Sequence, residues 1–231
     1  MKQALYSIFM LMAATMLIAC DAEPDALFTD DTTETPVLYD YYIDEYGNEG
    51  VVVYNMDKTS KYAIVMSLDE SLQSWGPMGE MVYGVDSIRS TLLSNHSYGV
   101  AMHQAMKARG INRYPAQAWC DQKNGGEKYA RAGSWRLPSY YEWGLIINRL
   151  SKINTAMTEM GGTPLDDSHH YWVCDEDYVG RIKINGTTSD YDCENRAVVT
   201  SPTKSTYGNK DRWLKKNKYY VRAIKYIYYE Y

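Results

Sequence analysis

The 231-residue chain lacks the short motifs that mark several common enzyme classes. It contains no G-x-S-x-G nucleophile elbow, no phosphate-binding P-loop and no H-E-x-x-H zinc motif. It also lacks an excess of basic residues, since 24 Lys and Arg stand against 29 Asp and Glu. A nucleic-acid-binding protein needs a basic footprint. The sequence therefore predicts no catalytic residue, no metal site and no cofactor, and it argues against a nucleic acid as partner.

Phenylalanine is scarce and tyrosine is abundant, with 2 Phe and 23 Tyr. Tyrosine joins an apolar ring to a polar hydroxyl, which suits half-buried strands and binding surfaces. The composition therefore favours a secreted, β-rich domain. Most of the tyrosines are expected to be packing residues.

One long apolar run occurs, directly after Lys2, and it ends in Leu17-Ile18-Ala19-Cys20. This pattern is typical of a bacterial lipoprotein signal, in which cleavage falls before an acylated cysteine. A membrane-spanning helix is the weaker alternative, because residues 3–19 fall short of the roughly 20 residues that a helix needs to cross a bilayer. We expect a signal peptide over residues 1–19 and a palmitate-type anchor on Cys20. The expected location is the outer membrane or cell surface, although Asp21 leaves inner-membrane retention open.

Lys and Arg are absent from residues 21–50, which carry ten acidic residues. Acidic segments of this kind are usually solvated and extended. The sequence therefore predicts a tether over residues 20–36 and one domain over residues 37–231.

Local patterns in that domain predict an α+β order of elements. Residues 50–54 and 61–68 are expected to form a hairpin, and helices are expected at 100–109 and 115–122. A long helix is predicted from Ser139, because Ser139-Tyr-Tyr-Glu142 is a capping box. Its apolar stripe runs from Trp143 to Met157. Short strands are expected at 171–174, 179–184, 197–200 and 219–228.

Three segments carry a resemblance to a family, and they occur in this order: Ala116-Gln-Ala-Trp-Cys120, then Ser134-Trp-Arg-Leu-Pro-Ser139 with Glu142-Trp143, then Tyr171-Trp172 with the late Tyr220-Val-Arg-Ala-Ile224. Over residues 50–227 the chain resembles bacterial surface-lipoprotein domains of the major-paralogous-domain type. Those domains are similar to the C-type-lectin-like fold of formylglycine-generating, or sulfatase-modifying-factor, enzymes. The resemblance implies two helices packed on short mixed or antiparallel sheets, with long loops near the C-terminus. It also implies a structural core of Trp135, Leu137, Ser139, Glu142 and Trp143, with Arg136 reaching a nearby carbonyl or carboxylate.

Cysteine and metal-ligand patterns are weak in this chain. In an oxidising compartment we expect a disulfide between Cys174 and Cys193, with Cys120 left as a buried free thiol. The Glu-Pro-Asn, Gln-Pro-Asp and Trp-Asn-Asp triplets of calcium-dependent lectins are absent. His169-His170 and the acids at 175–177 and 190–194 are metal candidates, but adjacent residues rarely converge on one ion, and solvated loops are the favoured interpretation.

The function that these patterns indicate is a non-enzymatic ligand-binding or adhesion module for a protein or glycan, held to the membrane through the lipid on Cys20. Variable function in such a fold belongs to its loops, here about 185–217. Three alternatives stay open: an accessory subunit of a surface assembly or pilus, a diversified surface receptor, and a less favoured formylglycine-generating enzyme. The candidate ligand contacts are aromatic and cationic: Tyr178, Tyr191, Tyr207, Lys210 and Trp213.

Overall fold

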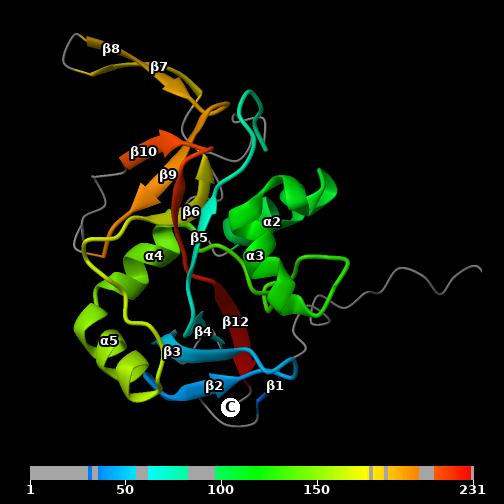
Figure 1. Cartoon of the computed structure of the whole chain (residues 1–231), viewed down its shortest axis with the longest axis vertical. Coiled ribbons are helices and arrows are strands. Elements are labelled where there is room, and N and C mark those ends of the chain that lie inside the picture. Colours follow the sequence, from blue (N-terminus) through cyan, green and yellow to red (C-terminus); the bar gives the residue numbers. More distant parts are fainter. Residues whose placement is uncertain are drawn as a thin grey trace, which may run out of the picture.

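The computed structural model describes residues 31–32, 36–55, 62–82, 97–176, 179–184, 187–202 and 211–229. These residues form two five-stranded sheets and a separate two-stranded hairpin, with helices packed on two sides. The fold class is therefore α+β, as predicted (Figure 1). Cys20, Tyr178, Tyr207 and Lys210 lie outside the described residues.

The first sheet has the strand order β1-β12-β4-β3-β2. Its predicted hairpin is confirmed as an antiparallel pair with an irregularity between Val52 and Tyr54. The C-terminal strand β12 pairs with β4 and, in parallel, with β1, so residues 31–32 of the predicted tether join the sheet. The strands are β1 (Asp31–Thr32), β2 (Tyr41–Ile43), β3 (Glu49–Asn55), β4 (Tyr62–Ser67) and β12 (Ile224–Tyr229).

The second sheet has the order β10-β9-β6-β11-β5, and a separate hairpin of β7 and β8 projects beyond it (Figure 1). The predicted loop over 185–217 is therefore wrong in part, because it contains β8, β9 and β10. The strands are β5 (Ser71–Ser74), β6 (Tyr171–Glu176), β7 (Val179–Ile184), β8 (Thr187–Asp192), β9 (Arg196–Thr200), β10 (Asp211–Leu214) and β11 (Lys218–Val221).

The single strand predicted at 219–228 is two strands in two different sheets. The chain leaves β11 at Val221 and enters β12 at Ile224. At this junction the Arg222 side chain is fully buried and donates to backbone oxygens of Ser67 and Leu68. The alternation of apolar residues does not reveal such a change of sheet.

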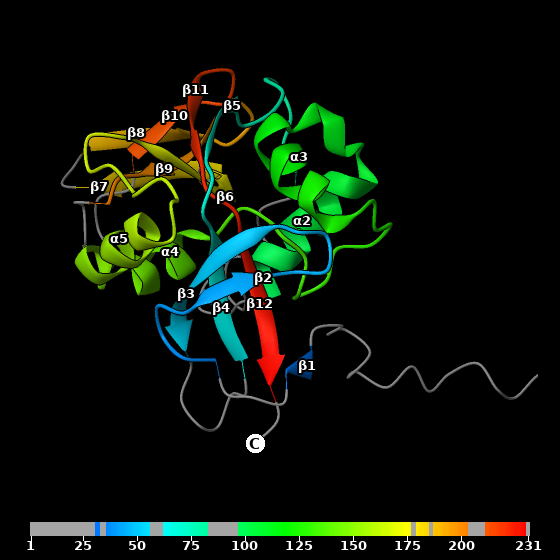
Figure 2. The ribbon, with the colours of Figure 1, turned by 60° about the horizontal axis from the view of Figure 1, so that its bottom comes forward.

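The helices flank the two sheets. They are α2 (Ser97–Ala108), η2 (Ile111–Arg113), α3 (Pro115–Asp121), η3 (Gln122–Asn124), α4 (Tyr140–Ile147) and α5 (Leu150–Glu159). Figure 2 shows α2 and α3 on one side of the strands and α4 and α5 on the other. The one long helix predicted from Ser139 is thus two helices. The break falls at Arg149 (φ −120°, ψ 20°), whose guanidinium lies 5.1 Å from the Tyr54 ring centre.

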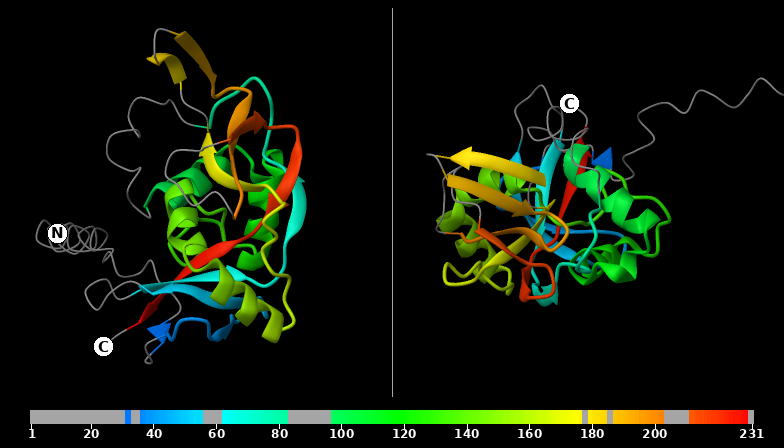
Figure 3. Two further views of the ribbon diagram at one scale, coloured as in Figure 1. Left: turned by 90° about the vertical axis from the view of Figure 1, so that its left-hand side faces the viewer. Right: turned by 90° about the horizontal axis from the view of Figure 1, so that it is seen from above.

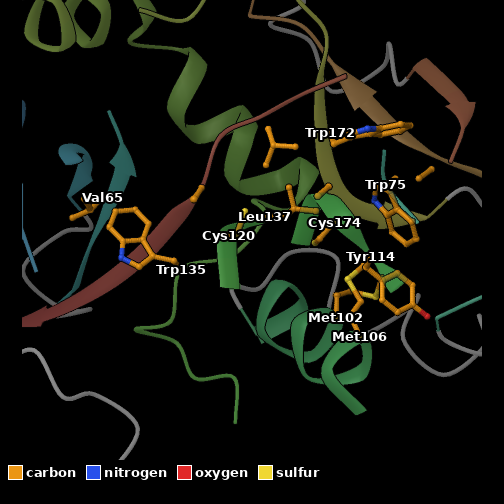
Figure 4. Packing of buried hydrophobic residues seen from close by; sticks show 14 of the residues in the cluster. Val65, Trp75, Met102, Met106, Tyr114, Cys120, Trp135, Leu137, Trp172 and Cys174 are labelled. Carbon is orange, nitrogen blue, oxygen red and sulfur yellow. The ribbon is translucent and has the colours of Figure 1, made fainter. Parts of the chain in front are cut away.

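Two hydrophobic clusters fill the space between the helices and the sheets. The first includes the fully buried Trp75, Trp172 and Tyr114 and packs against α2 and α3 (Figure 4). The second includes Trp143 and Tyr171 and packs against α4 and α5. Aromatic rings therefore supply much of the buried apolar surface that drives folding.

The segment 135–143 lies in the interior, and an ion pair holds it there. Trp135, Leu137 and Trp143 are each at most 1 % exposed. Arg136 forms two hydrogen bonds with the Glu142 carboxylate, at 2.8 and 2.5 Å. That carboxylate also accepts from the Ser139 backbone N–H at 2.7 Å, while the Ser139 hydroxyl accepts from the Glu142 N–H, so the capping box is present.

Electrostatics keep the Glu142 carboxylate charged. Burial alone would raise the pKa of Glu142, but the charge and hydrogen bonds of Arg136 outweigh it and lower that pKa. Gly99 of α2 allows the close approach, because a Cβ there would collide with the Arg136 guanidinium. The segment 135–143 is therefore a scaffold that joins α2 to the start of α4.

Candidate functional site

Trp213 is the one predicted ligand contact whose side chain the structure describes. It lies on β10, and its residue is 42 % exposed. Tyr191 lies in β8, while Tyr178, Tyr207 and Lys210 fall outside the described residues. The structure therefore does not test whether the five predicted residues gather at one place.

Trp213 belongs to a group of rings in tilted and edge-to-face contact that we call the aromatic ledge: Trp213, Tyr219 and His170, resting on Trp172. The ring centres of Tyr219 lie 6.0 Å from Trp213, 5.9 Å from His170 and 5.1 Å from Trp172. Trp172 is fully buried, and its indole N–H donates to the Gln73 carbonyl at 3.0 Å. The ledge thus has a fixed base and a half-exposed upper surface.

The charge beside the ledge is mixed. The Asp211 carboxylate lies 3.9 Å from His170 Nε2. Lys216 and Lys218 are exposed, but the neighbouring Lys215 is buried. Its ammonium group donates to Glu176 at 2.5 Å and lies 4.8 Å from the Trp75 ring centre. Lys215 therefore holds the core together and is not available to a ligand.

A second pair of rings is formed by the sequence neighbours of His170 and Tyr219, on the opposite face of the sheet. His169 stacks on Tyr220, with ring centres 3.7 Å apart and planes at 8°. Since neighbouring residues of a strand point to opposite faces, Tyr219 serves the ledge and Tyr220 serves His169. A cavity of about 540 Å³ opens at His169. Sequence reasoning missed this cavity because its walls come from distant segments.

Glu70 lines that cavity, and Arg222 pairs with it from behind. Arg222 Nη2 donates to Glu70 Oε2 at 2.6 Å and to the Thr163 carbonyl at 2.8 Å. The Tyr171 hydroxyl donates to the same Glu70 oxygen at 3.1 Å. The pair links the end of β4, the 161–169 loop and the junction between β11 and β12.

The predicted disulfide is wrong, because Cys174 and Cys193 are both free thiols. Cys174 belongs to the first hydrophobic cluster, whereas Cys193 contacts the sulfur of Met81. The two side chains thus occupy different surroundings. Cys120 is buried and free, as predicted. Burial raises the pKa of Cys193 to about 11, and it raises the pKa values of Cys120 and Cys174 as well, so these thiols stay protonated and are weak nucleophiles.

The acidic residues considered as metal ligands are acceptors within the fold. Asp175 accepts from the Tyr140 N–H at 2.7 Å, which positions the first turn of α4. Glu176 accepts from the Val82 N–H at 3.0 Å besides Lys215. Among the residues that the structure describes, no group of three or more His, Cys, Asp and Glu side chains has an arrangement that could hold a metal ion.

One buried histidine–aspartate pair connects α2 to α3. His103 Nε2 lies 2.7 Å from Asp121, which also accepts from Lys107 at 2.8 Å. Burial lowers the pKa of His103. Burial alone would raise the pKa of Asp121, but hydrogen bonds from His103 and Lys107 lower it to about 2. The His103 side chain has no exposed surface, so the pair can fasten helices but cannot reach a substrate.

Within the described ranges, no helix combines the length and the apolar character that crossing a bilayer requires. The sequence matches no protein-family model and no curated protein. The residues of the ledge and the cavity are therefore the basis for a functional conclusion.

Proposed function

We propose that the chain is a non-enzymatic binding or adhesion module that captures a protein or glycan on the aromatic ledge. The observation that carries this proposal is Trp213, a tryptophan 42 % exposed on a sheet strand and 6.0 Å from the ring centre of Tyr219. Exposed tryptophan and tyrosine are enriched at the centres of interfaces. The flat faces of such rings also suit the C–H faces of sugars.

The rigidity of the ledge supports this role. Trp172 and the Gln73 carbonyl fix the base on which Tyr219 rests. A site that is already ordered loses little conformational entropy when a ligand binds. His170 and Asp211 at the margin supply the polar contacts that orient a ligand.

We propose further that the fold is C-type-lectin-like. A late strand that returns to the opening hairpin, as β12 does on β4, supports this assignment. So do the two pairs of helices flanking the sheets and the buried Trp135–Trp143 segment. Fold alone does not determine function, so the argument for binding rests on the ledge.

The proposed location is the outer membrane or cell surface, with the lipid on Cys20. The apolar run that ends in Leu-Ile-Ala-Cys supports it. Cells grown with a fatty-acid analogue should label the protein, and Cys20→Ala should abolish the label. Labelling that persists in the variant would contradict the proposed anchor.

The ledge is tested with the full chain purified in detergent, on a glycan array and in a pull-down from envelope proteins. Trp213→Ala should weaken capture at least tenfold, since loss of a central aromatic contact costs 2 kcal/mol or more. Trp143→Phe is the matched control, because Trp143 is 1 % exposed and should leave capture unchanged. A ligand that binds Trp213→Ala as tightly as the parent chain, or that is lost on calcium chelation, would defeat the proposal.

A structural accessory subunit is the second candidate, and strand β2 favours it. In the described part of the chain β2 is the last strand of the first sheet. Its Tyr41 and Ile43 are 46 % and 55 % exposed. Edge strands with apolar side chains are templates for pairing with another chain. Ile43→Lys should then reduce assembly while ligand capture on the ledge persists, which native gels of envelope extracts would show.

A further inference from the structure

The cavity at His169 has walls of two kinds. Leu150 and Pro164 provide apolar surface, whereas Glu70, Asp166 and Asp167 provide carboxylates. Its volume of about 540 Å³ lies within the range of small-molecule and side-chain sites. Figure 1 shows α5 beside the returning chain that leads into β6, and these segments contribute the outer wall.

The cavity is already formed. The Asn154 amide donates to the Leu165 carbonyl at 2.8 Å and accepts from the Leu165 N–H at 2.9 Å. These two bonds fasten the 161–169 loop to α5. On the inner side, Arg222 holds the Thr163 carbonyl.

Two carboxylate oxygens in this cavity accept no hydrogen bond from the described residues. Asp166 uses Oδ1 for the N–H and hydroxyl of Ser168, and Glu70 uses Oε2 for Arg222 and Tyr171. Asp166 Oδ2 and Glu70 Oε1 are left over. They face the two ring nitrogens of His169 at 3.7 and 3.9 Å, beyond hydrogen-bond distance.

The His169 ring lies between these two carboxylate oxygens. Its Nδ1 is buried and has no hydrogen-bond partner among the residues that the structure describes. Stacking on Tyr220 fixes the ring, so the ring does not rotate freely toward either carboxylate. The cavity thus holds two carboxylate oxygens that accept no hydrogen bond from the described residues, on either side of a polar ring.

The charge in the cavity is negative. Arg222 compensates Glu70, but in the described part of the chain Asp167 has no ion-pair partner. Hydrogen bonds from the Ser168 side chain and backbone lower the pKa of Asp166, so its carboxylate is charged at neutral pH. The cavity therefore favours a cationic group over a neutral or anionic one.

We propose that this cavity binds the side chain of a lysine from a peptide or protein partner. A lysine ammonium carries three donors on a flexible four-carbon stem. The donors match the free oxygens of Glu70 and Asp166, and the methylenes match Leu150 and Pro164. An amino sugar fits less well, because no Trp, Tyr or Phe is among the described residues that line the cavity, and a sugar ring packs best on such a face.

The full chain in detergent should bind a capped Gly-Gly-Lys-Gly-Gly peptide in isothermal titration calorimetry. The same peptide with norleucine in place of lysine should bind at least tenfold more weakly, and affinity should fall as salt rises. Equal binding of the norleucine peptide would overturn the role of the ammonium. Glucosamine that binds as tightly as the lysine peptide would overturn the choice of partner, and no binding of either compound would overturn the proposal.

Variants locate the site. Asp167→Asn and Asp166→Asn should each weaken the lysine peptide roughly tenfold. Asp167→Asn removes charge without touching the Ser168 turn, which separates a binding effect from a local folding defect. Glu159→Gln is the matched control, an exposed acid on α5 outside the cavity. Trp213→Ala should leave lysine-peptide binding unchanged, so that failure of the ledge and failure of the cavity can be told apart.

Discussion

Two arginine–glutamate pairs in this domain have opposite designs. Arg136 and Glu142 are six residues apart and neither side chain is exposed. Arg222 and Glu70 are 152 residues apart, and the Glu70 side chain is 11 % exposed. Glu142 uses both oxygens within the protein, whereas Glu70 uses one and turns the other toward the cavity. The first pair is closed and structural, and the second leaves an acceptor for a ligand.

Glu142→Gln should give the largest effect, because it leaves the Arg136 guanidinium buried without a counter-charge. Breaking a buried ion pair by removing one partner costs about 3–5 kcal/mol. Urea unfolding followed by tryptophan fluorescence measures this loss. The double variant Arg136→Met with Glu142→Leu should recover part of it, since both charges are then gone. If Glu142→Gln were as stable as the parent chain, the buried Arg136–Glu142 ion pair would not be essential to the fold.

Glu70→Gln should cost less, about 2 kcal/mol, because Arg222 keeps its bonds to backbone carbonyls of residues 67, 68 and 163. The same unfolding experiment compares the two pairs directly. Asp69→Asn is the neighbouring control, since Asp69 is 57 % exposed and its pair with Lys123 should contribute at most about 1 kcal/mol. If Glu70→Gln lowered the free energy of unfolding as much as Glu142→Gln does, the two ion pairs would not differ in their contribution to stability.

The His103–Asp121 pair adds a pH dependence near pH 6.5, whereas the lowered pKa of Glu142 acts only at more acidic pH. The folded pKa of His103 is lowered from 6.5, so below pH 6.5 the unfolded chain takes up a proton that the folded chain does not. The contribution of His103 to the free energy of unfolding is therefore fully present above pH 6.5. Below pH 6.5 it should fall by up to about 1.4 kcal/mol per pH unit. The lowered pKa of Asp121 adds a further loss only below pH 4. Melting curves between pH 7.5 and 5.5 measure the first effect, and His103→Gln should flatten it.

Ser139→Ala should give the smallest effect, about 1 kcal/mol, which is the usual contribution of an N-cap. The Glu142 carboxylate still accepts from the backbone at position 139, so the ion pair survives. Thr155→Ala at an exposed position of α5 is the control and should leave thermal stability nearly unchanged.

The difference between the two ion pairs also explains which structural residues could be predicted from the sequence. The closed pair and its capping box lie within eight residues, so the local Ser-x-x-Glu pattern predicts the roles of Ser139 and Glu142, and the family resemblance implies that Trp135 and Leu137 are structural. The open pair joins residues that are distant in sequence, and no local pattern points to Glu70. The apolar stripe from Trp143 to Met157 predicts which residues are buried, but it does not show the break at Arg149, where no glycine or proline occurs.

The candidate site was predicted only in part for the same reason. Trp213 is recognisable as an aromatic residue near the C-terminal strands. Tyr219 and His170 join it only through the pairing of β10, β9, β6 and β11. The expected disulfide fails because two cysteines in an oxidising compartment need adjacent side chains, and adjacency is a property of the sheet and not of the spacing.

The parallel pairing of β1 with the end of β12 fixes the point at which the N-terminal segment joins the domain. It brings residues 31–32 to the pole where β12 ends, while β7, β8 and β10 lie at the opposite pole (Figure 3). The run from β11 through β12 covers residues 218–229 and extends along this axis. At about 3.3 Å per residue, such a run spans at most about 40 Å. A domain tethered through its N-terminal segment would therefore carry the β10 strand of the ledge at the end of the molecule far from the tether.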